Sequence, residues 1–204
     1  NNFLIQNDCK FENIETPNDL KLNINKWIFV EFTNTNEKIK KSIDSYRFDE
    51  AARIAYQFVW HSFCDWYLEL SKTVFYSENN ENIEETRNVA SFIFTQILVI
   101  LHPFIPFLTE EIWLKNKLDK DGKDFLMLKN WSEASSNKDK DSDEVNEIIE
   151  FVSSIRSFKN EIEISPGSFV KMLVSKINPK IKKFIENNSN TLKKIGRINE
   201  FVTE

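Results

Sequence analysis

One stretch of the chain, residues 47–72, constrains the fold more than any other. Read as a helix, it brings apolar side chains to one face, because they recur three and four residues apart. That face consists of Ala52, Ala55, Tyr56, Val59, Phe63, Trp66 and Leu70. We therefore predict one long helix over residues 49–73, with this face, including the indole of Trp66, turned into a core.

A second face of the same helix has a mixed composition. It carries an imidazole, two carboxylates, an ammonium, an amide and a leucine, again three and four residues apart: Gln57, His61, Asp65, Leu68, Glu69 and Lys72. A helix used only for packing more often has a plain Glu/Lys outer face. From the residues alone two interpretations stay open, a face that is merely solvated and a face that binds a partner.

The rest of the N-terminal two thirds is also helical in pattern. Gly and Pro are scarce, with three and five residues in 204, which favours long helices over tight turns. We predict helices over residues 25–46, 84–102 and 106–115. Pro103 and Pro106 separate the last two, because proline lacks a backbone N–H and clashes with the preceding turn. Short connections make neighbouring helices pack side by side, so the fold class is mainly α, an antiparallel helical bundle.

The C-terminal part has a different pattern. Residues 132–142 are low in apolar and high in charged side chains, which predicts a linker between a bundle at 1–131 and a second domain at 143–204. In the second domain we predict a helix from residue 143, a strand at 169–174, a basic helix at 181–195 and a strand at 198–202. These elements form a small α/β subdomain. One more short strand is predicted before the linker, at 125–128.

The charge of the chain is unevenly distributed. The net charge of −5 argues against indiscriminate binding of nucleic acid, DNA included. Residues 133–150 are strongly acidic, whereas residues 171–197 hold seven Lys and one Arg against Glu186 alone. A basic end on an acidic chain fits the docking of one polyanion in one orientation. The alternative is that these lysines only keep an amphipathic segment soluble.

Strong catalytic and metal-binding motifs are missing from the sequence. His61, Cys64 and Asp65 are close together on one helix, but no second segment supplies the remaining ligands of a closed metal site. A hydrolase built on His61 and Asp65 would need a nucleophile in a strained turn, and none accompanies them. Cys64 is itself predicted to lie in the core. We therefore expect neither a metal nor a cofactor in this chain.

Cysteine usage and hydropathy indicate the compartment. Cys9 and Cys64 lie far apart without metal-like spacing, which is typical of reduced thiols in the cytoplasm. The N-terminus lacks the basic and apolar regions of a secretory signal. The longest apolar run, residues 92–108, contains His102 and two prolines and is better explained by a buried helix and a turn than by a membrane span.

Three motifs resemble one known family. FVWHSFCDWYLELSK at residues 58–72 is similar to the signature helix of the anticodon-binding domain of valyl-tRNA synthetases. NKWIFVEF at 25–32 and LHPFIPFLTEEIW at 101–113 resemble the helices on either side of it, in the same order and spacing. The resemblance extends over residues 25–167. Isoleucyl enzymes are similar but lack the Phe-Cys-Asp-Trp run of residues 63–66.

The resemblance implies a function and a site. The whole enzyme would join valine to its tRNA with ATP and Mg²⁺, in a nucleotide-binding domain whose HIGH-type and KMSKS-type motifs do not occur here. This chain would be a piece of that enzyme, a monomer that binds the anticodon loop of valine tRNA and performs no chemistry. Leu68 and Glu69 match family positions that border the anticodon pocket, and the residues that share or flank their face are Trp60, His61, Asp65 and Lys72.

Two departures and two alternatives accompany this interpretation. Lys159 stands where the family more often has Arg, and the long C-terminal coiled coil of the family is absent after Glu204. The alternatives are the corresponding domain of an isoleucyl-type enzyme and a helical scaffold that binds a protein. A scaffold would show no salt-dependent affinity for RNA.

Overall fold

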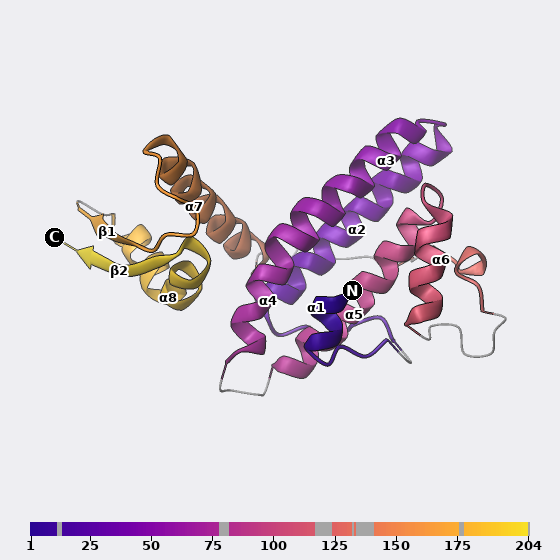
Figure 1. Ribbon diagram of the computed structural model, residues 1–204, viewed down its shortest axis with the longest axis horizontal. Coiled ribbons are helices and arrows are strands. Elements are labelled where there is room, and N and C mark those ends of the chain that lie inside the picture. The colour runs from indigo at the N-terminus through magenta and orange to yellow at the C-terminus, as the bar shows by residue number, and fades with distance from the viewer. Residues whose placement is uncertain are drawn as a thin grey trace. The chain divides into compact units, whose positions relative to one another are not determined.

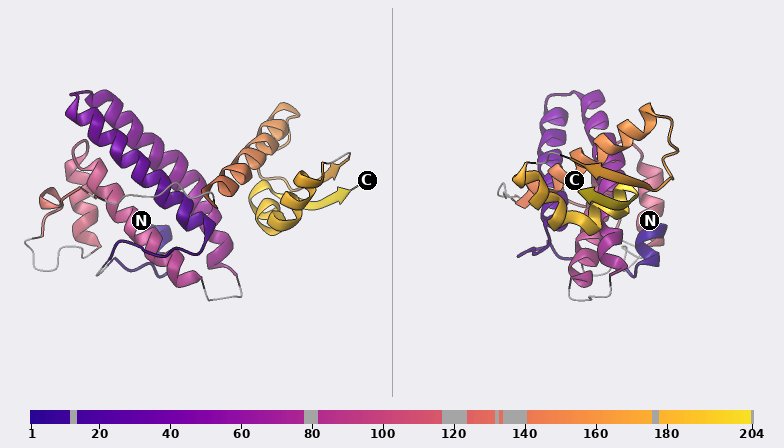
Figure 2. Two further views of the ribbon diagram at one scale, coloured as in Figure 1. Left: turned by 180° about the vertical axis from the view of Figure 1, so that it is seen from behind. Right: turned by 90° about the vertical axis from the view of Figure 1, so that its left-hand side faces the viewer.

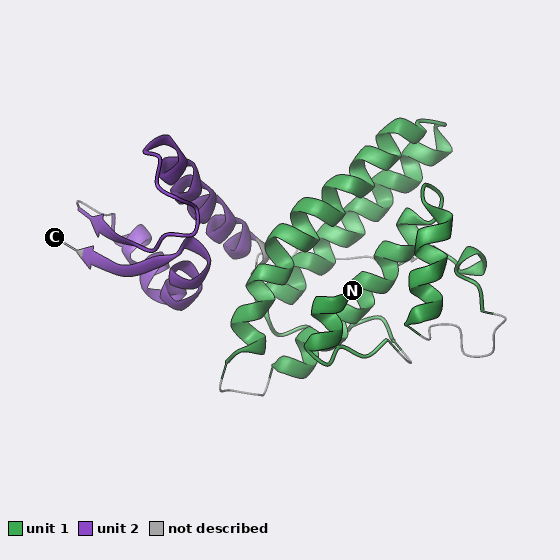
Figure 3. Cartoon of the chain, viewed as in Figure 1, with its two compact units in different colours: residues 1–142 green, residues 143–204 purple. Residues whose placement is uncertain are grey.

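The computed structural model describes residues 1–11, 14–77, 82–116, 124–131, 133, 141–175 and 178–203. The chain divides into two compact units, residues 1–142 and 143–204 (Figure 3). The linker that we predicted over residues 132–142 lies mostly outside the described residues.

Helices form the first unit (Figure 1). They are α1 (Asn2–Gln6), α2 (Asn23–Asp44), α3 (Phe48–Gln57), the π-helix η1 (Phe58–Tyr67), α4 (Leu68–Phe75), α5 (Ile83–Leu101), α6 (Pro106–Lys115) and the 3-10 helix η2 (Leu126–Leu128). A short turn at residues 45–47, with Tyr46 at a φ of 58°, reverses the chain so that α3 lies beside α2 (Figure 2). The prediction of a mainly α fold is confirmed.

The core of this unit is built on aromatic contacts between helices. Phe32 of α2 has no exposed surface, and its ring centroid lies 6.0 Å from that of Phe58 and 6.2 Å from that of Phe92. It therefore joins α2, η1 and α5 at one point. The predicted helices at 84–102 and 106–115 are present as α5 and α6, and α5 is buried along most of its length.

A buried polar network fixes the same helices against one another. The amide of Asn25 donates to the Oε1 of Glu85 (2.9 Å) and to the Oγ1 of Thr86 (3.1 Å), and its oxygen accepts from the hydroxyl of Tyr67 (2.9 Å). Glu85 also accepts the backbone N–H of Leu22 (3.0 Å) at the start of α2. Burial raises the pKa of Tyr67 well above its usual value, so its hydroxyl stays protonated and keeps this bond.

The prediction of one continuous α-helix over residues 49–73 is wrong in the number of residues per turn. The central ten residues, 58–67, are π-helical, and their hydrogen bonds reach one residue further along the chain than in an α-helix. The buried side chains there are accordingly Phe58, Phe63 and Tyr67, five and four residues apart. The α-helical spacing instead selected Val59 and Trp66, which are only partly buried.

Three more side-chain and strand predictions are corrected. Tyr56, which was placed in the core, is 59% exposed. Cys64, also predicted to be buried, is an exposed free thiol. The segment predicted as a strand at 125–128 is the 3-10 helix η2, with Leu126 as its buried side chain. The indole N–H of Trp113 donates to the carbonyl of Asp124 (2.8 Å) and holds this segment against α6.

The second unit is a helix followed by a parallel β–α–β motif. It contains α7 (Asp141–Glu161), β1 (Val170–Val174), α8 (Pro179–Gly196) and β2 (Ile198–Thr203), with β1 and β2 paired in parallel. These elements agree with the helix and strands that the sequence predicted. Lys159 is buried inside the unit, where its ammonium donates to the carbonyls of Ser168 (3.1 Å), Gly196 (2.9 Å) and Arg197 (3.3 Å).

Candidate functional site

The outward face of η1 and α4 holds the predicted site residues. Tyr67 is fully buried and hydrogen-bonded, so it fixes the rotation of the helix at the point where α4 begins. Leu68 and Glu69 follow it directly and are therefore turned toward the surface, where both are partly exposed. A ligand at the surface can therefore reach both side chains.

Two contacts between a carboxylate and a nitrogen-bearing side chain run along this face. The Nδ1 of His61 lies 3.4 Å from the Oδ2 of Asp65, and the Nζ of Lys72 contacts the Oε1 of Glu69. Both pairs lie at the surface, where such contacts contribute about 0–1 kcal/mol and exchange readily with other partners. The face therefore offers two carboxylates that a ligand with hydrogen-bond donors can recruit at low cost.

The first helix of the chain packs next to this face. The ring of Phe3 in α1 lies 6.1 Å from the ring of Phe75, and the ammonium of Lys72 lies 5.7 Å from the centroid of Phe3. Lys72 is thus shared between Glu69 and an aromatic ring. The side chain of Glu69 remains 43% exposed.

Trp60 forms part of an exposed ring pair. Its ring lies parallel to that of Tyr56, with an angle of 3° between the planes and 6.2 Å between the centroids. Trp60 is 53% exposed and Tyr56 is 59% exposed. Trp66, which was predicted to face inward, is partly buried. The structure therefore pairs Trp60 with Tyr56, which the α-helical spacing predicts to lie in the core.

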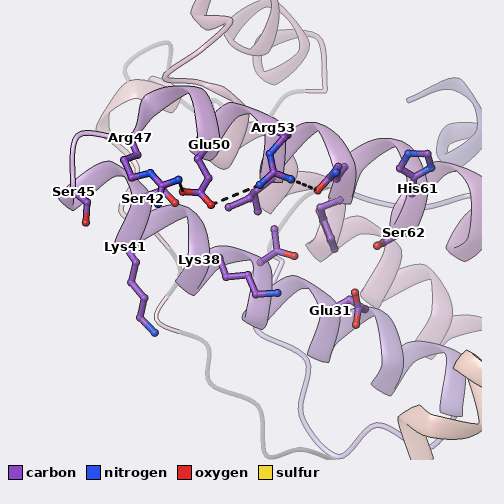
Figure 4. A pocket seen from close by; sticks show the side chains of 14 residues that line it. Glu31, Lys38, Lys41, Ser42, Ser45, Arg47, Glu50, Arg53, His61 and Ser62 are labelled. Carbon is purple, nitrogen blue, oxygen red and sulfur yellow. Dashed lines mark hydrogen bonds and ion pairs between the residues drawn. The ribbon is translucent and has the colours of Figure 1, made fainter.

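A basic groove lies between α2 and α3 (Figure 4). It has a volume of about 640 Å³ and reaches from the end of α2 to His61 and Ser62 in η1. Its cationic lining residues are Lys38, Lys41, Arg47 and Arg53. None of these four residues is among the site residues predicted from the sequence. The signal was present in the spacing of Lys38 and Lys41 on α2, with Ser45 at its C-terminus, and of Arg53 and Gln57 on α3, with His61 following in η1. It shows only once the two helices are paired.

Glu50 organises the guanidinium groups of the groove. One of its carboxylate oxygens lies 2.7 Å from the Nη2 of Arg47, and the other lies 3.6 Å from the Nη2 of Arg53. The Nη1 of Arg53 donates to the side-chain oxygen of Gln57 (3.1 Å). On the opposite wall, burial raises the pKa of Glu31, an effect that the nearby ammonium of Lys38 partly offsets. Four cations thus face two carboxylates.

The described residues contain neither a cluster of metal ligands nor a helix that could span a membrane. Among those residues, no three or more His, Cys, Asp and Glu side chains are grouped as a metal ion would need. His61 and Asp65 face each other, and Cys64 supplies no third ligand to a site with them. Within the same residues, none of the helices has the length and hydropathy needed to cross a bilayer.

Comparison with known proteins gives a consistent result. The family described as the anticodon-binding domain of tRNA ligase matches residues 25–174. The chain is 53% identical over 198 residues, 97% of its length, to the valine–tRNA ligase of Pelagibacter ubique. It is 39% identical over 184 residues to the enzyme of the same name from Buchnera aphidicola and 35% identical over 180 residues to that from Agrobacterium fabrum. The chain spans 23%, 19% and 19% of the length of these three relatives.

Proposed function

The chain belongs to the family of anticodon-binding domains of tRNA ligases, and from this premise we propose that it binds the anticodon loop of valine tRNA as one part of a valine–tRNA ligase. The observation that carries the proposal is the match to valine–tRNA ligases along nearly the whole chain, at up to 53% identity. Because the chain spans about a quarter of that relative or less, the joining of valine to tRNA is proposed for a larger protein that contains it.

The outward face of η1 and α4 has the chemistry to read unpaired bases. Single-stranded loops are recognised by stacking of the bases on flat side chains and by hydrogen bonds to their edges. The carboxylate of Glu69 can accept a hydrogen bond from the exocyclic amine of a cytosine or an adenine. Leu68 provides an apolar wall beside it, and Lys72 would release Glu69 as the base binds. His61, Asp65 and Trp60 extend the same surface.

Several properties of the larger protein belong to the same proposal. ATP and Mg²⁺ would bind outside this chain, which itself needs no cofactor. The protein would act as a monomer in the cytoplasm, where Cys9 and Cys64 remain reduced. The lysines of residues 171–194 would contact phosphates and contribute affinity without selecting a sequence.

The first prediction concerns Glu69. We expect Glu69→Ala to weaken binding of valine tRNA by about 1–3 kcal/mol, because a base-edge contact is lost, and to leave the fold intact, because an exposed substitution costs roughly 0.5 kcal/mol or less. The measurement is a titration of both proteins against valine tRNA and a version with exchanged anticodon bases. The loss should shrink for the exchanged tRNA, from which the contact is already missing.

Glu111→Ala is the matched control for Glu69→Ala. Glu111 is also a half-exposed glutamate paired with a lysine of the same helix, the Nζ of Lys115 at 3.0 Å, but it lies on α6. It should leave both affinities unchanged. If Glu69→Ala binds both tRNAs as tightly as the unchanged protein, the reading role of Leu68 and Glu69 is wrong.

The second prediction concerns catalysis. We expect the purified chain to show no valine-dependent exchange of pyrophosphate into ATP, because its sequence contains neither nucleotide-binding motif of the synthetase catalytic domain. The assay measures labelled ATP formed in the presence and absence of valine. Exchange that depends on valine would contradict the assignment of all chemistry to the rest of the larger protein.

A further inference from the structure

The groove between α2 and α3 has an excess of positive charge on a chain that is acidic overall. Lys38, Lys41, Arg47 and Arg53 line it together with Glu31 and Glu50, while the whole chain carries −5. Glu50 contacts both guanidinium groups, but each guanidinium has several N–H donors and one carboxylate cannot use all of them. The groove is therefore suited to a ligand that brings negative charge and acceptor oxygens.

The Tyr56–Trp60 ring pair stands next to this groove. On the helix surface, Tyr56 precedes Gln57 by one residue and Trp60 precedes His61 by one, and both Gln57 and His61 line the groove. Arg53 lies three residues before Tyr56, which places it on the neighbouring turn on the same side. The two rings thus adjoin the row of α3 and η1 that carries Arg53, Gln57 and His61 into the groove.

The exposure of the parallel rings of Tyr56 and Trp60 requires an explanation. Tyr56 and Trp60 each leave more than half of their surface exposed, although burial of such rings is a main source of stability. Aromatic side chains beside a basic groove are the arrangement with which proteins hold single-stranded nucleic acid: the groove follows the phosphates and the rings stack on the bases. The volume of about 640 Å³ lies within the roughly 300–1,000 Å³ range of ligand pockets.

We propose that the α2–α3 groove binds the sugar–phosphate backbone of a single-stranded RNA segment, and that the Tyr56–Trp60 pair stacks on an unpaired base of that segment. This inference rests on the proposed binding of an anticodon loop and extends its contact surface from Trp60 and His61 to Tyr56 and the groove. Leu68 and Glu69 select bases by their edges, whereas the groove and the ring pair bind any sequence with an accessible base and two or more phosphates.

The stacking half of the proposal is tested with ring variants. A fluorescently labelled anticodon stem–loop of valine tRNA is titrated with the chain and with Trp60→Leu and Tyr56→Leu, and binding is followed by anisotropy. We expect affinity to fall about 5- to 150-fold for Trp60→Leu, the range measured for loss of one base–aromatic stack. Trp60→Tyr keeps a flat ring and should recover most of the affinity. Phe107→Leu, at a ring that is 91% exposed on α6, is the matched control and should change nothing.

The phosphate half is tested by salt dependence. Replacing Lys38 and Arg53 together by Gln should weaken binding of valine and non-valine stem–loops equally and lower the slope of log affinity against log salt by about 1 for each phosphate contact. Lys115→Gln on α6 is the charge control and should leave the slope unchanged. Trp60→Leu should also leave the slope unchanged, because stacking releases no counterions.

The outcomes separate the two proposals. If the unchanged chain binds no stem–loop at any salt concentration, the proposed function itself fails. If Glu69→Ala loses discrimination between anticodons while the ring and groove variants bind as tightly as the unchanged chain, the proposed function stands and the inference is overturned. Circular dichroism of each variant checks the fold, and Tyr56→Leu provides a second ring variant if Trp60→Leu does not fold.

Discussion

We expect Lys159→Met to lower the free energy of unfolding of the 143–204 unit by about 2–4 kcal/mol. Lys159 is 4% exposed, and its ammonium donates to three backbone carbonyls, those of Ser168, Gly196 and Arg197. The carbonyl of Arg197 also accepts from the backbone N–H of Val170 (3.1 Å), so the substitution leaves two carbonyls, those of Ser168 and Gly196, without this donor. Each such acceptor costs roughly 1–3 kcal/mol. The apolar side chain of methionine fills the space of the lysine stem and returns only part of this. Because the ring of Phe151 on α7 also packs on that of Phe184 on α8, the substitution tests how much the ammonium adds to these packing contacts.

The effect of Lys159→Met on the 143–204 unit can be measured separately, because the tryptophans and tyrosines all lie in the first unit. All five Trp and four Tyr residues precede residue 143, so tryptophan fluorescence reports on the first unit alone. Hydrogen exchange of peptides from α7, β1 and α8 reports on the second. We expect exchange in these peptides to accelerate while the fluorescence transition in urea keeps its midpoint.

Lys183→Met is the matched control for Lys159→Met. Lys183 is exposed on α8 of the same unit, so the same change should alter stability by roughly 0.5 kcal/mol or less. Equal exchange rates in Lys159→Met and the unchanged chain would mean that water replaces the ammonium at the three carbonyls, and the anchoring role of Lys159 would be wrong.

The helix boundaries that the sequence predicted well are those with local signals. Pro103 and Pro106 cannot continue a helix, and the structure ends α5 at Leu101 and begins α6 at Pro106. The β–α–β order of the second unit followed from the change of period after Gly167 and from Pro179 at the start of α8. In each case the chemistry of one residue restricts its own backbone, which needs no knowledge of the tertiary structure.

The π-helix was not predictable in the same way. Its hydrogen bonds are less favourable than those of an α-helix, so it forms where tertiary contacts demand it. Here Phe58 packs on Phe32, and Tyr67 bonds to Asn25. Phe32 and Asn25 both lie on α2. Phe58 and Tyr67 must therefore point to the same side of their helix although they are nine residues apart. Local periodicity instead favoured Trp66 as the inward residue.

The outward residues of the candidate site were predictable only in part. Leu68 and Glu69 lie at the surface as expected. The predicted orientation of the preceding residues was wrong, because residues 58–67 are π-helical and not α-helical. Tyr56 and the groove cations were missed. A tyrosine next to Ala55 in an apolar stripe has no local sign of exposure, and Lys38 and Arg53 become neighbours only when α2 and α3 pair.

We expect Phe32→Ala to destabilise the first unit by about 3–5 kcal/mol, the usual cost of emptying a phenylalanine site in a packed core. Phe32 has no exposed surface and contacts the rings of Phe58 and Phe92. Since a domain of this size is stable by roughly 5–15 kcal/mol, the substitution removes a large share of that stability.

The measurement for Phe32→Ala is urea unfolding followed by tryptophan fluorescence, to which the buried Trp27 and Trp113 contribute. Phe107→Ala deletes the same ring at a position that is 91% exposed and should shift the midpoint by little, because the deleted ring leaves no cavity.

The consequence for the site follows from the contact with Phe58, the first residue of the π-helix. Loss of the Phe32 ring removes one of the two contacts that fix the phase of η1, so hydrogen exchange should accelerate in residues 58–67 before it does so in α6. If Phe32→Ala and Phe107→Ala shift the midpoint equally, the packing of α2 against η1 does not position Leu68 and Glu69.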